Sequence, residues 1–316
     1  MRSIQNVTLG LLLVICVAST VLAQSPAAGS SAAQDSDVLR GIVPEKFVDQ
    51  RPRKSVRPST RPKYRPATSA AVATEKTQSA TAGVARYAQL GLTIWQLRKS
   101  TTGDNAARLP VADTAGASDW TPIRVEAGKP LAVGDLVRLS IESSVAGYLY
   151  VIDRGQYQDG TLSEPSLIFP TTRTRGGDNS VKPGRLIELP AQNDRPNYFR
   201  LKSSRGELVA ELLTIIVANE PIPGLAEEIG SRPLALNKEQ LAKWQIAWNA
   251  RVEHFELEGG EGKAWTRAEQ EAGADETREL TQDDAPPQTI FRVARRPDAP
   301  LLVNVELRIS PAVVNK

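Results

Sequence analysis

The chain has 316 residues, with 39 Lys and Arg, 36 Asp and Glu, one His and one Cys, which gives a net charge of +3. A single imidazole and a single thiol nearly exclude a zinc site, which needs three or four ligands, and they exclude a disulfide framework. A chain of this length can bury a sizeable hydrophobic core without disulfides.

Residues 1–23 are predicted to be an export signal peptide. Arg2 is followed by an apolar stretch at 9–17, and small side chains precede Gln24 at the positions that signal peptidase reads. Cleavage there removes Cys16 and leaves a mature chain without a thiol. An uncleaved anchor is the alternative, but the apolar stretch is shorter than the roughly 20 residues of a spanning helix. We expect a periplasmic or extracellular protein whose mature chain has no transmembrane span.

Residues 24–86 are predicted to be a disordered linker rich in Pro, Ala, Ser and basic side chains. They hold 11 basic and 5 acidic residues, whereas 87–316 is mildly acidic. Four arginines, each followed by proline, are candidate contacts to an anionic envelope surface or another envelope protein: Arg51, Arg57, Arg61 and Arg65. A soluble tether is the alternative. Nucleic acid is not expected as a partner, because the chain is predicted to be exported and the linker lacks interleaved aromatic residues.

Residues 87–316 are predicted to form a single β-rich domain organised around 134–170. The stretch 137–142 alternates apolar and polar residues, so it reads as a strand with one apolar face. The stretch 148–152 is apolar on both faces, which indicates a central strand. The short connection between them favours an antiparallel hairpin.

Further apolar runs predict strands at 92–97, 167–169, 185–189 and 211–218. A helical insertion is expected at about 237–272, with capping signatures at Asn237 and Thr266 and a short strand at 252–257 between them. A closing hairpin is expected at 288–309. Short strands joined by turns favour an antiparallel two-sheet sandwich of immunoglobulin-like layout.

Two loops contain candidate binding residues. Asp153, Asp159 and Glu164 are weak metal candidates, because carboxylates on one loop can gather around Ca²⁺ but these lack the spacing of a calcium-binding loop. Arg173 and Arg175 precede two glycines and are candidates for anion or partner contact, although an ordinary exposed loop is the simpler interpretation.

Other residues resemble chemistry less closely. His254 lies in an alternating stretch and is expected to face solvent, without the nucleophile and carboxylate that a catalytic base needs. The stretch 259–263 has the wrong spacing for a phosphate loop. Trp244 and Trp248 are four apart, which favours core packing over a binding platform. No catalytic residue and no cofactor are predicted.

The order of the strand motifs resembles the domain-of-unknown-function 4384 family of exported bacterial proteins. The resemblance covers about 92–218 and rests on these motifs: GLTIWQLR, DLVRLSIES, AGYLYVIDR, LIFPTTRTRGGDN and GRLIELP. It implies an accessory or ligand-sensing module and supplies no catalytic residues.

Three functional hypotheses follow from the sequence. The first is a non-catalytic binding or scaffolding module of the bacterial cell envelope, tethered through the basic linker at 24–86. The alternatives are a metal-assisted hydrolase that uses the 153–164 loop and a purely structural envelope protein.

Overall fold

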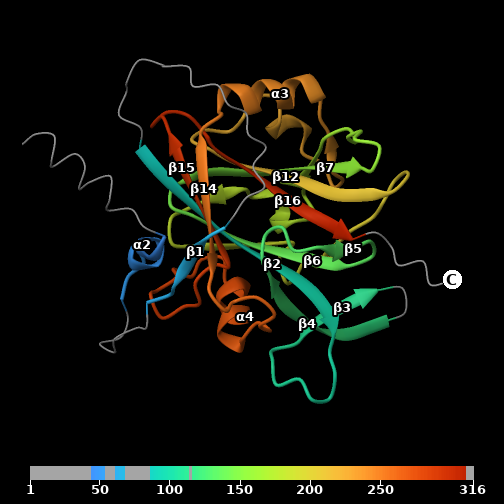
Figure 1. Ribbon diagram of the computed structural model, residues 1–316, viewed down its shortest axis with the longest axis vertical. Coiled ribbons are helices and arrows are strands. Elements are labelled where there is room, and N and C mark those ends of the chain that lie inside the picture. The colour runs from blue at the N-terminus through green and yellow to red at the C-terminus, as the bar shows by residue number, and fades with distance from the viewer. Residues whose placement is uncertain (1–43, 54–60, 68–85, 114–115, 311–316) are drawn as a thin grey trace, which may run out of the picture. The chain divides into compact units, whose positions relative to one another are not determined.

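The computed structural model describes residues 44–53, 61–67, 86–113 and 116–310. The predicted signal peptide and most of the predicted linker lie outside these residues. The described part is mainly β, and two largely antiparallel sheets pack face to face, so the predicted sandwich is confirmed (Figure 1). In this part of the chain, no helix is long and apolar enough to cross a membrane.

The first sheet has nine antiparallel strands within the described residues. They are β1 (Tyr64–Pro66), β2 (Arg86–Lys99), β3 (Leu109–Asp113), β4 (Gly116–Val125), β6 (Leu136–Ser143), β10 (Leu186–Leu189), β11 (Phe199–Arg200), β14 (Arg251–Leu257) and β15 (Thr289–Arg295). The long strand β2 organises the sheet. Along one edge it pairs first with β15 and then with β4, and along the other edge it pairs with β6.

The second sheet has seven strands within the described residues, in the order β13, β8, β7, β12, β16, β5, with β9 beside β7. Their bounds are β5 (Leu131–Ala132), β7 (Gly147–Tyr157), β8 (Ser166–Phe169), β9 (Ser180–Val181), β12 (Leu208–Ala218), β13 (Leu234–Ala235) and β16 (Leu301–Ser310). The β16–β5 pair is parallel and the others are antiparallel.

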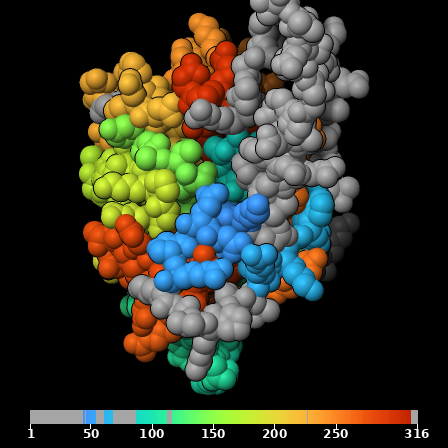
Figure 2. All heavy atoms as spheres, turned by 90° about the vertical axis from the view of Figure 1, so that its left-hand side faces the viewer, coloured from blue at the N-terminus to red at the C-terminus, as the bar shows by residue number. Residues whose placement is uncertain are grey.

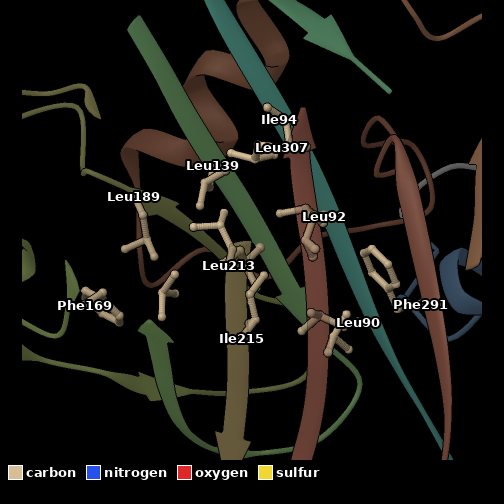
Figure 3. Packing of buried hydrophobic residues seen from close by; sticks show 14 of the residues in the cluster. Leu90, Leu92, Ile94, Leu139, Phe169, Leu189, Leu213, Ile215, Phe291 and Leu307 are labelled. Atoms are coloured by element: carbon tan, nitrogen blue, oxygen red, sulfur yellow. The ribbon is translucent and has the colours of Figure 1, made fainter. Parts of the chain in front are cut away.

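The inner faces of the two sheets form one hydrophobic core (Figure 3). Leu92 and Leu139 from the nine-stranded sheet meet Leu213 and Ile215 from the other, and none is more than 4% exposed. Each such side chain contributes roughly 1.5–3 kcal/mol when it is fully buried. The alternation of apolar residues along each strand therefore holds the sandwich together.

Strand β7 is buried on both faces, as predicted. Leu149 and Val151 belong to the core between the sheets, and Tyr150 and Ile152 belong to a second cluster on the outer face. The buried Tyr150 hydroxyl has the partner that burial requires, because it accepts a 2.9 Å hydrogen bond from the backbone of Ile222.

Three α-helices and two short 3-10 turns complete the described residues: α2 (Glu45–Asp49), α3 (Lys238–Ala247), α4 (Arg267–Ala274), η1 (Arg175–Gly177) and η2 (Ala226–Glu228). Both predicted caps form. Asn237 accepts hydrogen bonds from the first turn of α3, and Thr266 makes a reciprocal capping box with Glu269 on α4. Leu241 packs α3 on the outer face of the seven-stranded sheet.

Two predicted hairpins are wrong. Strands β6 and β7 belong to different sheets, and so do β15 and β16. Each short connection therefore crosses the end of the sandwich. In each pair, both strands direct apolar side chains into the core between the sheets. They contribute to that core from opposite sides, so they face each other across it and do not pair edge to edge.

The predicted insertion at 237–272 contains both expected helices, and the strand expected at 252–257 is β14. This strand pairs with β15 inside the nine-stranded sheet. The helices therefore lie on different sheets, since α3 packs on the seven-stranded sheet and α4 lies near β10 of the other (Figure 1).

Candidate functional site

The outer face of the nine-stranded sheet carries polar side chains that are buried. Arg138, Ser140 and Glu142 alternate with core residues along β6, and each is at most 5% exposed. Trp95 on β2 lies beside them, and its indole nitrogen donates a 2.8 Å hydrogen bond to Ser140 Oγ. Buried polar groups are costly unless they are paired, so the segments that cover this face must supply partners.

Three ion pairs, each between different parts of the chain, supply much of that pairing. They are Arg51–Glu142 at 2.6 Å, Arg124–Glu269 at 2.6 Å and Arg138–Glu188 at 2.7 Å. Removing one member of such a pair leaves the other as an uncompensated buried charge. The first two pairs therefore fix the segment at Arg51 and helix α4 on the sheet, whereas Arg138–Glu188 joins the neighbouring strands β6 and β10.

Burial also changes the titration of carboxyl groups on this sheet. It raises the pKa of Glu188, while the charge of Arg138 acts in the opposite direction. It raises the pKa of Glu256 on β14 to about 7, although Thr289 and Gln288 donate hydrogen bonds to that carboxylate. These groups hold structure by accepting hydrogen bonds from fixed neighbours.

Arg51 occupies a complete guanidinium site. Its Nε and Nη2 donate to the two carboxylate oxygens of Glu142 at 3.0 and 2.6 Å. Its Nη1 lies 3.5, 3.1 and 3.3 Å from the backbone carbonyl oxygens of Thr281, Asp284 and Ala285. We call the carboxylate and these three carbonyls the guanidinium site. A planar guanidinium matches such a set, whereas an ammonium has only three donors.

Arg51 comes from the predicted linker, which corrects the expectation that all of 24–86 is disordered. Two segments, 44–53 and 61–67, pack on the sandwich, and we call them the arm (Figure 2). Phe47 and Tyr64 are buried with Ile290 in one small cluster. The physical reason is that these apolar side chains, which are unusual in a linker, find cover on the outer face of the nine-stranded sheet.

The arm is also held through its backbone. Strand β1 adds to the edge of β14, with Tyr64 opposite Leu257. The Tyr64 hydroxyl donates a 2.7 Å hydrogen bond to the carbonyl of Pro287. The close approach requires glycine at position 91, where a Cβ would lie 2.8 Å from Pro287 Cγ and 2.9 Å from the ring of Phe47.

Two cavities are lined in part by Arg51, and we call the surface around them the cleft. One of about 30 Å³ is also lined by Trp95, Arg124 and Glu269. A larger one of about 170 Å³ is also lined by Phe47, Ser144 and Glu279. The arm therefore lies over a hollowed surface that charged side chains help to line.

The other arginines predicted as partner contacts lie in different settings. Arg61 and Arg65 are exposed, and they pair with Asp49 at 3.4 Å and Glu126 at 2.7 Å. Arg57 lies outside the described residues. The prediction that Arg51 contacts an external anionic surface is wrong, because its side chain is only 2% exposed.

The predicted anion loop is divided between solvent and an ion pair. Arg173 is exposed. The side chain of Arg175 is 5% exposed, and its Nε lies 3.0 Å from Glu276 Oε1, so it joins the loop to the segment after α4. Arg175 is therefore engaged within the chain and is not supported as an anion contact, while Arg173 lies in the exposed loop that the simpler interpretation predicts.

The predicted metal candidates are not brought together. Asp153 lies within strand β7 and is in hydrogen-bond contact with Glu211 on β12, where burial raises its pKa to about 6. Asp159 is exposed and accepts hydrogen bonds from Thr161, and Glu164 is exposed. In the described ranges, no group of three or more His, Cys, Asp or Glu side chains could hold a metal ion.

The remaining candidates have structural surroundings. His254 is half-buried, with its ring 5.8 Å from that of Phe291, so it faces solvent only in part, and burial lowers its pKa. The 259–263 turn bonds to the backbone of β4. The rings of Trp244 and Trp248 stack 5.6 Å apart and pack on the outer cluster of the seven-stranded sheet, as the core interpretation predicts.

Sequence reasoning missed the guanidinium site because its parts are far apart in the chain. Local alternation identifies Glu142 only as part of a polar strand face, and no local pattern singles out Asp284. The available signal was the pair Phe47 and Val48, followed by Tyr64, in a stretch otherwise poor in large apolar residues. Such residues indicate a segment that has something to pack against.

No family model matches this chain, and neither a curated protein nor a solved structure shows a significant match.

Proposed function

We propose that this chain is a non-catalytic binding or scaffolding module of the bacterial cell envelope. The observation that supports this best is the way in which the domain holds the arm. An extended segment is added to a strand edge, one arginine is bound on five acceptor atoms, and the chain on both sides is anchored by buried aromatic residues. These are features of a surface that binds polypeptide.

The charges of the cleft favour binding over catalysis. Arg51, Glu142 and Glu269 are each held in an ion pair that joins neighbouring chain segments. None of these three side chains is therefore placed to transfer protons to or from a substrate. The metal-assisted alternative loses its support, because Asp153, Asp159 and Glu164 do not share a site. The purely structural alternative remains the one to separate by experiment.

The envelope location rests on the predicted export signal at 1–23 and on the family resemblance. Together with the mildly acidic domain and its basic arm, they favour a partner in the envelope, which is either a protein or an anionic surface.

The test is a pull-down from envelope extract with the immobilised wild-type chain. We expect at least one envelope protein to be captured in a saturable way and to be released by excess soluble chain. A chain that captures nothing that soluble chain competes away would refute the binding role and favour the structural one. Addition of Ca²⁺, Mg²⁺ or Zn²⁺ is expected to leave the melting temperature unchanged, and a clear rise would favour the metal-assisted alternative.

A further inference from the structure

The acceptor atoms of the guanidinium site all belong to the domain and none belongs to the arm. Its carboxylate lies on β6, and its carbonyls lie in the turn 281–285. That turn is fixed by Asp284, which accepts hydrogen bonds from the backbone and hydroxyl of Thr281 and lies 2.6 Å from Arg278. The acceptors are therefore preorganised for a guanidinium from any source.

The domain also forms hydrogen bonds with the backbone of the arm beside Arg51. The side-chain amide of Gln282 donates to the carbonyls of Asp49 and Arg51 at 2.8 and 2.9 Å. The backbone N–H of Gln282 donates to the carbonyl of Pro52 at 3.1 Å. Backbone contacts of this kind bind an extended segment, and the arginine gives the segment its register.

In the sequence, the arm precedes the sandwich, and residues 68–85 connect it to β2. These eighteen residues span at most about 60 Å when fully extended. The arm of a second copy would offer the same side chains and the same backbone to the same site. Only the effective concentration set by the joining stretch would separate the two arrangements.

We propose that two copies of this chain exchange their arms, so that Arg51 of one copy occupies the guanidinium site of the other. This rests on the proposed scaffolding function and deepens it by naming the partner, which is a second copy of this chain. Each copy then supplies a residue without which the site of its partner is incomplete, since Glu142 is 3% exposed and would remain unpaired.

The test mixes two full-length variants that are defective in complementary ways. Arg51→Ala has an intact site and no arginine to fill it, and Glu142→Gln has an intact arm and a weakened site. We expect each variant alone to be monomeric and the equimolar mixture to form a one-to-one dimer, measured by size-exclusion chromatography with light scattering. The matched control mixes Arg51→Ala with the double variant Arg51→Ala/Glu142→Gln, and it is expected to stay monomeric because neither copy has the arginine.

A mixture that remains monomeric like the control overturns arm exchange, whatever the pull-down with the intact chain finds. If either variant is unfolded by circular dichroism, a labelled peptide of residues 44–66 is titrated into the wild-type chain instead. We expect the peptide to bind at millimolar concentrations or below and the Arg51→Lys peptide to bind about tenfold more weakly. Equal binding of the two peptides, or no binding of either, overturns the proposal.

Discussion

Replacing Arg51 with alanine is expected to destabilise the domain strongly, although the residue belongs to a stretch whose composition predicts disorder. The side chains of Arg51 and Glu142 are 2% and 4% exposed, and their closest atoms lie 2.6 Å apart. Alanine removes every donor to the guanidinium site. Glu142 is then left as a buried carboxylate without its ion-pair partner, and three backbone carbonyls lose an N–H.

Removing one partner of a buried ion pair costs about 3–5 kcal/mol. For a domain of this size, 1 kcal/mol lowers the melting temperature by about 2–4 °C, so the expected loss is roughly 6–20 °C. The same contacts correct the expectation from composition that all of 24–86 is disordered, and deletion of 24–85 is expected to lower the melting temperature by several degrees.

The measurement is urea unfolding of wild type, Arg51→Ala and a matched control, Arg53→Ala. Arg53 is exposed and donates to Gln282 Oε1 at 2.7 Å, so its loss is expected to cost less than about 1 kcal/mol. The double variant Arg51→Met/Glu142→Leu is expected to regain most of the loss, since it leaves no unpaired charge. If Arg51→Ala is no more destabilising than Arg53→Ala, the arm is not part of the folded domain.

Three further outcomes are expected. N-terminal sequencing of exported material is expected to begin at Gln24, and material that still begins at Met1 would contradict the predicted cleavage. Leu149→Ala and Ile152→Ala are each expected to cost about 2–5 kcal/mol in denaturant melts, because they open cavities on opposite faces of β7, and near neutrality of either would contradict its two-sided burial. Burial, followed by the charge of Asp153, raises the pKa of Glu211 from 4.5 to about 8, so its contribution to stability is full below pH 4.5 and is lost as pH rises through about 8. Glu211→Gln is expected to remove that loss, on the order of 2 kcal/mol between pH 5 and 9, and an unchanged pH dependence of the melting temperature would refute this assignment.

Local sequence patterns predicted the features that depend on neighbours in the chain. The caps at Asn237 and Thr266 form as expected, because a side chain only has to reach backbone groups two or three residues away. The two-sided burial of 148–152 is confirmed, since an apolar residue at every position leaves no face for solvent. The sandwich itself is confirmed because alternation along many short strands requires two faces to meet.

Tertiary structure alone decided which strands pair and what covers the outer faces. The alternation along β6 shows that Glu142 lies opposite the core, but alternation carries no information on whether solvent or another segment lies there. That is settled by the contact of Glu142 with Arg51, which lies 91 residues away, and by the contacts of Arg51 with the turn at 281–285, which lies at least 230 residues from it. In the same way, a short connection after residue 142 is compatible with a hairpin or a crossing between sheets. The shared core of both strands selects the crossing, and no local pattern encodes it.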